Sequence, residues 1–129
     1  MSYESRMIVV DRYEFDNGHV WGEEIFRFNL CAMGYDLVNG KSFCDIFDTE
    51  IDFDVYGRSH ELDRDEDKYA YRKDCYGKIC GMTTIDKVIE WLEKADMDYR
   101  RAKSFLAALK GFKENESDYG DIRVVHFGY

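Results

Sequence analysis

Acidic side chains are the residues of this sequence whose spacing first points to chemistry. Asp54 is followed by Glu66 and Lys68 in a loose match to the Asp…Glu-x-Lys pattern of metal-dependent nucleases. In such enzymes the carboxylates hold Mg²⁺, and the metal activates a water molecule for attack on phosphate. The pattern is short, and the strongly negative surroundings disfavour an anionic substrate. A small metal-dependent nuclease or other hydrolase that uses these three residues is therefore kept as an alternative.

A second acidic motif resembles a calcium-binding loop. Asp63, Asp65 and Asp67 alternate along the chain, and Asp74 stands at the twelfth position counted from the first of them. The sixth position of such a loop requires glycine for a sharp turn, and here it is Lys68. The sequence therefore favours a solvated acidic loop over a calcium site.

Cysteine and histidine form no recognisable catalytic motif. Cys75 and Cys80 have a spacing that would suit half of a zinc site, but no second pair of ligands follows at a recognisable distance. The histidines are scattered, and His126 lies among apolar neighbours, which is typical of a core or sheet residue. We therefore predict no catalytic residue, no cofactor and no bound metal, and the participation of Cys75 and Cys80 in a metal site is left open.

Charge is distributed unevenly along the chain. The 129 residues include 18 basic and 27 acidic side chains, which gives a net charge of −9. Ten acids and two arginines give residues 45–67 a charge of −8, whereas residues 100–113 carry five bases and no acid. The net acidity argues against a protein that grips nucleic acid over most of its surface. We expect the basic segment to pair with acids of the same or a second molecule.

The centre of the acidic segment alternates three acids with three apolar residues: Glu50, Ile51, Asp52, Phe53, Asp54 and Val55. This period of two predicts a half-buried strand. Residues two apart on a strand project from one face about 6.6–7 Å apart, close to the spacing of phosphates along a nucleic-acid backbone. The acids are therefore predicted to form a row that fits a basic nucleic-acid-binding groove. The alternative is an ordinary solvated strand face.

The elements that must position these residues are strands in the first half of the chain. β-branched and aromatic residues at 7–15 and 24–32 lie on either side of Asp16-Asn17-Gly18, a strong turn signal. Asn39-Gly40 predicts a tight hairpin, because both residues tolerate a positive φ. Residues 57–74 are polar and are expected to form a loop with a short strand at its end.

The second half of the chain changes to a helical period. Apolar residues recur at helical spacing over about 84–95 and 98–110, with Thr83 as the first cap and Gly111 as the final stop. Residues 122–127 predict a last strand. We therefore predict an α+β fold, in which a helical hairpin packs on one face of an antiparallel sheet of about 4–6 strands. Residues 1–129 are expected to form one domain.

Composition narrows the class of protein further. The 21 aromatic residues are too many for an intrinsically disordered chain, and no apolar run approaches the roughly 18 residues that span a bilayer. Residues 1–6 lack the layout of a secretory signal, so the four cysteines are expected to be reduced thiols. The expected location is the cytoplasm of a bacterium or of an infected host cell.

These observations favour a non-enzymatic binding protein that presents an acidic, aromatic face to a basic partner. In charge and size alone, the chain is comparable to small inhibitors from phages and mobile elements, which occupy the nucleic-acid channels of nucleases or CRISPR effectors. A self-associating structural protein, a homodimer through its acidic strand and basic helix, is a further alternative. The predicted partner-binding residues are Asp45, Asp48, Glu50, Asp52, Asp54, Tyr56, Asp63, Asp65, Glu66, Asp67, Tyr69 and Tyr71.

Overall fold

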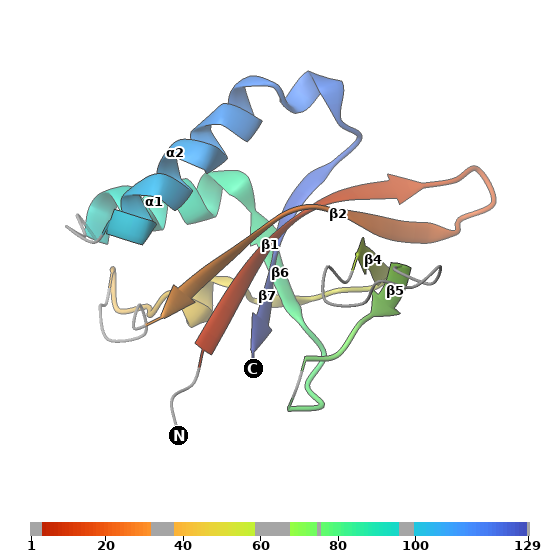
Figure 1. Ribbon diagram of the computed structural model, residues 1–129, viewed down its shortest axis with the longest axis horizontal. Helices are drawn as coiled ribbons and strands as arrows, with labels where there is room; N and C mark the ends of the chain where they lie inside the picture. Colours follow the sequence, from red (N-terminus) through yellow and green to blue (C-terminus); the bar gives the residue numbers. More distant parts are fainter. Residues whose placement is uncertain (1–3, 32–37, 59–67, 75, 96–99, 129) are drawn as a thin grey trace.

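The computed structural model describes residues 4–31, 38–58, 68–74, 76–95 and 100–128. They form one sheet and a pair of helices (Figure 1). The strands are β1 (Glu4–Glu14), β2 (Val20–Cys31), β3 (Thr49–Glu50), β4 (Asp54–Arg58), β5 (Lys68–Tyr71), β6 (Gly81–Thr84) and β7 (Ile122–Gly128). The helices are α1 (Ile85–Ala95) and α2 (Arg100–Glu114), and two short 3₁₀ turns are η2 (Cys44–Ile46) and η3 (Glu116–Asp118). Among the described helices, none is long and apolar enough to span a membrane.

The sheet has seven strands in the order β3-β6-β7-β1-β2-β4-β5, somewhat more than predicted. It is mixed rather than purely antiparallel, because β4 runs parallel to β2. Residues 51–53 alone separate β3 from β4, although β6, β7, β1 and β2 lie between them in the sheet. The sheet therefore curls, so that a connection of three residues spans the distance between β3, at one edge, and β4, next to the other edge. The α+β prediction with a helical hairpin on one face is confirmed.

The helices cover one face of the central strands (Figure 1). Met7 and Val9 of β1 and Val124 of β7 contribute to the core on this side. The helices bring to it a set of fully or nearly fully buried side chains: Ile85, Val88, Trp91, Leu92, Ala102, Phe105 and Leu109. These residues recur at the spacing of one helical face, so the two helices were predictable from the apolar period.

The opposite face has a second core, which the curl of the sheet encloses. Ile51, Phe53 and Val55 are buried there against Ile8 and Val10 of β1. The predicted alternation of buried and outward residues is therefore correct, but the single strand predicted over 50–55 is wrong. The backbone leaves the sheet at residues 51–53, because β3 and β4 pair with different neighbours, β6 and β2.

The predicted turns are present. Gly18 has a φ of 84° between β1 and β2, and Asn39 and Gly40 have φ values of 52° and 78°. Both residues of the second turn therefore have the positive φ that a type I′ turn requires. Val38 and Lys41 form an isolated bridge around this turn.

The ends of the helices differ from the prediction. The Oγ1 atom of Thr84 accepts the amide N–H of Lys87 at 3.3 Å, so Thr84 caps α1, while Thr83 is buried in β6. Gly111 does not end α2, which continues to Glu114. The added turn packs the ring of Phe112 against Phe26, and this contact offsets the roughly 1 kcal/mol that glycine costs inside a helix.

Candidate functional site

The hairpin of β1 and β2 extends beyond the rest of the sheet (Figure 1). The two strands pair as far as Glu14 and Val20, whereas β7 accompanies β1 from Ser5 to Asp11. On the other side, β4 pairs with β2 through Trp21–Glu23. Residues 14–19 at the tip are exposed to solvent. A protruding tip of this kind is available to a partner without any movement of the core.

Aromatic rings cluster on one face of this hairpin. Trp21 stacks on Tyr13, its directly opposed partner, with ring centroids 4.8 Å apart. Phe15 lies 6.3 Å from Trp21 and stacks on the His19 ring at 6.1 Å. Tyr56 of β4 meets the Trp21 ring at 5.9 Å. The exposed fractions of Phe15 and Tyr56 are 51% and 41%, so these rings form a surface rather than a core.

An irregularity in β2 places the aromatic rings on the face that the helices cover farther along. Val9 pairs with Phe26 and Val10 with Glu24, so Ile25 is an extra residue in the ladder. An extra residue of this kind shifts the alternation of the following side chains by one. Trp21 and Phe26 consequently share a face although their numbers differ in parity.

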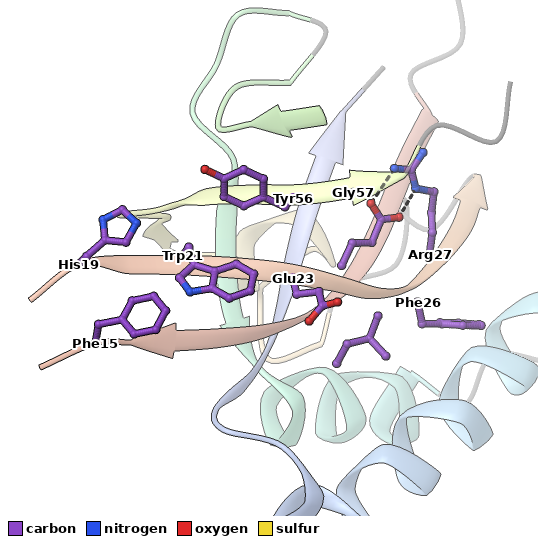
Figure 2. Close-up of a pocket in the computed structure, with 10 residues that line it drawn as sticks. Phe15, His19, Trp21, Glu23, Phe26, Arg27, Tyr56 and Gly57 are labelled. Carbon is purple, nitrogen blue, oxygen red and sulfur yellow. Dashed lines mark hydrogen bonds and ion pairs between the residues drawn. The ribbon is translucent and has the colours of Figure 1, made fainter. Parts of the chain in front are cut away.

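These rings line a groove of about 920 Å³ (Figure 2). The volume lies in the range of about 300–1,000 Å³ that is typical of ligand sites. Its wall is formed by aromatic, charged and small residues of the hairpin and β4: Phe15, His19, Trp21, Glu23, Glu24, Ile25, Phe26, Arg27, Tyr56 and Gly57. The groove is open along one side, so it suits a segment or side chain of a larger ligand.

The charges of the groove are unequal. Glu24 forms a forked ion pair with Arg27, with N–O distances of 2.7 and 2.9 Å. Glu23 is exposed and forms no ion pair with any other described residue. A hydrogen bond to the Asp11 carboxylate, with smaller effects of desolvation and of the charges on Asp11 and Glu23, raises the pKa of Tyr13 to about 12. The groove therefore presents one carboxylate without an ion-pair partner among the described residues, beside its aromatic rings.

The indole N–H of Trp21 is buried and finds no acceptor among the described residues. Leaving such a donor unpaired costs about 1–3 kcal/mol. By contrast, the N–H of Trp91, the other tryptophan of the chain, donates to the Lys41 carbonyl at 3.0 Å. The Trp21 ring thus lies in the groove without a hydrogen bond from its N–H to any described residue.

The structure divides the predicted acidic residues among several places. Asp45 accepts the Ser42 amide N–H at 3.0 Å, a bond that lowers the pKa of its carboxyl. Asp48 lies 3.8 Å from the Lys87 ammonium, and Glu50 is exposed on β3. None of these three residues lines the aromatic groove.

Two further predicted acids are paired within the molecule. Asp52 lies 3.4 Å from the Arg12 guanidinium, and Asp54 accepts from Arg72 at 3.0 Å. Asp54 is the register partner of Trp21, which places it at the border of the groove. Tyr56 is in the groove itself. The row predicted from Glu50 to Asp54 is thus split, and Asp54, the acid of this row at the border of the groove, is partly neutralised.

The remaining predicted residues do not extend this surface. The Tyr71 ring packs edge-on against Phe127 at 5.3 Å and contributes to the second core. Tyr69 lies in β5, and its side chain is outside the described residues. Also outside them are Asp63, Asp65, Glu66 and Asp67, and with them most of the calcium-like and nuclease-like patterns.

A smaller pocket of about 250 Å³ combines thiol, imidazole and carboxylate groups. Cys44 Sγ lies 3.6 Å from His126 Nε2, and Cys80 lines the same pocket. Burial is the main cause that lowers the pKa of His126 to about 4, so its ring is neutral at pH 7. In the part of the chain that the structure describes, no three His, Cys, Asp or Glu residues are placed to hold a metal. Cys75, the proposed partner of Cys80 in a zinc site, lies outside that part.

Sequence reasoning missed Phe15, Trp21 and Glu23. A signal was present, because residues 13, 15, 19 and 21 are aromatic on both sides of the Asp16-Asn17-Gly18 turn. Residues two apart on a strand share a face, and the pairing of Tyr13 with Trp21 across the turn places the rings of the two strands on the same face.

A scan against protein-family models matches no family, and searches of curated proteins and of solved structures find no similar chain. The geometry of the groove and the charge of the chain are therefore the observations that bear on function.

Proposed function

We propose that the protein is a non-enzymatic binding protein that engages a basic partner through the aromatic groove and the carboxylates around it. The observation that carries the proposal is the exposed aromatic cluster on the protruding hairpin. Phe15 and Tyr56 are large rings exposed by 51% and 41% beside the half-buried Trp21. Tryptophan and tyrosine are enriched among the residues that dominate interface energies, and exposed apolar patches mark interaction sites.

The charge of the protein supports a basic partner. The net charge is −9, and the exposed acids Glu14, Asp16 and Glu23 lie on the same hairpin as the rings. Opposite charge accelerates association and disfavours acidic partners. The rings then provide the contact area, so the two features have separate roles.

The partner we propose is a basic nucleic-acid-binding protein, such as a nuclease or a CRISPR effector, and the effect is inhibition by occupation of its nucleic-acid channel. In the channel, the aromatic rings of the protein take the place of nucleic-acid bases, and its carboxylates take the place of phosphates. Asp52 and Asp54 are partly neutralised by Arg12 and Arg72. The hairpin, rather than a straight row of acids on one strand, is therefore the element we expect to enter the channel. Such a function would place the protein in the cytoplasm of a bacterium or an infected cell.

A competition assay tests the proposal. Purified nucleases and RNA-guided effectors are each bound to a fluorescent nucleic acid, and displacement by the protein is followed by anisotropy. We expect displacement from at least one member of the panel, with an apparent affinity that falls as salt is raised. Absence of displacement across the panel at low salt contradicts the proposed function.

The decisive variant in this assay is Trp21→Ala combined with Tyr56→Ala. It leaves the net charge unchanged and removes two rings from the groove. We expect it to weaken displacement at least tenfold. Phe127→Leu, on the opposite core, is the control for a general loss of aromatic packing. Equal effects of the two variants would show that the groove has no special part in binding.

A further inference from the structure

Two rings of the groove stand nearly at right angles. The planes of Trp21 and Tyr56 make an angle of 79°, with ring centroids 5.9 Å apart. The face of an aromatic ring carries negative charge, and two rings at this angle form the corner of a cage that attracts organic cations. In Figure 2 both rings line the groove, one from β2 and the other from β4. The corner is therefore accessible from the open side.

Glu23 supplies a counter-charge on the same part of the sheet. It is the register partner of Tyr56 in the pairing of β2 with β4, and it follows Trp21 by two residues. Its carboxylate has no ion-pair partner among the described residues, unlike that of the neighbouring Glu24, which Arg27 neutralises. A cation in the groove would therefore meet an available carboxylate as well as the rings.

The protein holds one of its own guanidinium groups in a similar setting. The Arg12 guanidinium lies over the Phe53 ring, 5.8 Å from its centroid, and pairs with Asp52 at 3.4 Å. Arg12 lies on the other face of the hairpin from Tyr13 and Trp21, because it pairs with Gly22, whose added Cβ would meet Phe53. A ring and a carboxylate thus hold a guanidinium on this face of the hairpin. The groove on the other face also combines rings with a carboxylate, and no described cationic side chain forms an ion pair with that carboxylate.

We propose that the groove binds an arginine side chain of the partner, with the guanidinium against the Trp21 and Tyr56 rings and its charge opposed by Glu23. This assignment rests on the proposed function and specifies the group that the partner must present. Arginine fits better than lysine because its guanidinium is planar, stacks on aromatic faces and is weakly hydrated. It also donates two parallel N–H groups to a carboxylate.

The test is a titration with capped tri-arginine, trilysine and tricitrulline peptides, followed by NMR. The chain has two tryptophans, so each indole N–H gives one reporter signal. We expect tri-arginine to shift the Trp21 signal to saturation and to leave the buried Trp91 signal in place. Trilysine should bind at least fivefold more weakly, and tricitrulline, which has the shape of arginine without its charge, should cause no saturable shift. Equal binding of trilysine or tricitrulline overturns the assignment.

Matched variants distinguish the contribution of the site to binding from that of the net charge. Glu23→Gln should weaken tri-arginine binding at least fivefold, and Tyr56→Leu should do so while leaving the net charge unchanged. Glu93→Gln makes the same charge change as Glu23→Gln at an exposed residue of α1, and no residue of this helix lines the groove. In Figure 1, α1 lies on the side of the molecule away from the tip of the hairpin. Equal weakening by Glu23→Gln and Glu93→Gln would mean that bulk charge alone attracts the peptide, and it would overturn the assignment.

The peptide titration and the partner assay can fail independently. If a partner is displaced from its nucleic acid equally well by the native protein and by Glu23→Gln with Tyr56→Leu, the arginine site is wrong, whereas inhibition of a basic partner through another surface stands. If tri-arginine saturates the groove but no basic partner loses its nucleic acid, arginine recognition is supported and the proposed inhibition is wrong.

Discussion

The two ends of the β1–β2 hairpin carry similar aromatic residues on one face, yet the structure uses them differently. Toward the helices, Phe28 stacks on Phe105 with centroids 4.9 Å apart, and Phe26 meets Phe112 at 5.9 Å. Toward the tip, the rings contact one another and Tyr56, and no described helix covers them. Whether a ring belongs to the core or the surface is thus decided by the reach of α2 rather than by its residue type.

Because of this difference, the covered rings contribute mainly to folding stability and the groove rings mainly to ligand binding. Rings beneath α2 lose most of their contact with water when the protein folds, completely so for Phe105, and their burial therefore contributes to the free energy of unfolding. Rings of the groove keep part of their exposed surface, and that part is buried only when a ligand arrives. Substitutions at the two ends should consequently affect different measurements.

The largest effect should come from the covered end. Phe105 is fully buried, and Phe105→Ala should lower the free energy of unfolding by about 3–5 kcal/mol. Chemical denaturation measures the loss, and tri-arginine affinity of the fraction that remains folded should be unchanged. A loss below about 1 kcal/mol would show that α2 does not cover the sheet as described.

Acid should lower the stability of the folded protein through His126, a buried residue that is 9% exposed and whose ring contacts Phe47. Burial lowers its pKa from 6.5 to about 4, an effect that the charge of Asp74 opposes and that of Lys78 reinforces. Between these pH values the unfolded chain binds more protons than the folded protein, so stability falls as the pH is lowered from 6.5 to 4. The total is roughly 3 kcal/mol.

His126→Gln isolates this contribution. The difference between the native protein and the variant in free energy of unfolding, measured by denaturation at several pH values, should shrink as the pH is lowered through that window. Shared carboxylates titrate in both proteins, so their effect cancels. Parallel curves for the two proteins would contradict a buried neutral His126.

On the face of β2 that points away from the groove, Gly22 leaves no space for a larger side chain. A Cβ at Gly22 would lie 2.6 Å from Phe53 Cε2 and 2.6 Å from Val10 Cγ1. Gly22→Ala should therefore cost about 1–3 kcal/mol. Gly111→Ala is the matched control, because its Cβ meets nothing within 4 Å and alanine favours a helix, so it should stabilise by about 0.5–1 kcal/mol. A neutral Gly22→Ala would indicate that Phe53 is not packed under the hairpin.

The smallest effect on stability should come from the open end. Tyr56→Ala removes a ring that is 41% exposed and should cost less than about 1 kcal/mol in thermal or chemical denaturation. The same variant should abolish saturable binding of tri-arginine. A stability loss similar to that of Phe105→Ala would remove the distinction between the two ends.

The sequence predicted local features well. The two helices, the Asn39-Gly40 turn and the alternating burial of Ile51, Phe53 and Val55 follow from periodicity and turn chemistry, which depend on near neighbours. Thr83 and Gly111 were assigned wrongly as helix ends. In those cases a pairing with β7 and the packing of Phe112 outweighed the local preference.

The candidate site was harder to predict because it depends on distant pairings. Asp52 and Asp54 looked available, but Arg12 and Arg72 reach them only through the curl of the sheet and the turn after β5. Tyr56 was identified as a binding residue, yet its neighbour Trp21 was not, since the parallel pairing of β4 with β2 has no signal in either segment alone. The irregularity at Val9 and Val10, which turns Trp21 and Phe26 to the same face, likewise has no recognisable signal in the sequence.

The pairing of β1 with β7 has a consequence for the way the chain is made. Ser5 pairs with Gly128, so the middle of the sheet joins the first described strand to the last. A ribosome adds roughly 5–20 residues per second, and β1 therefore waits on the order of ten seconds for this partner. During that time Ile8 and Val10 have β2 beside them but not β7, and an unpaired apolar edge invites association with other chains. Contacts so distant in sequence also slow the search for the native state. Until synthesis reaches β7, pairing with β2 can cover one edge of β1 only, and the Asn17-Gly18 turn that displays the groove is also what brings β2 to that edge.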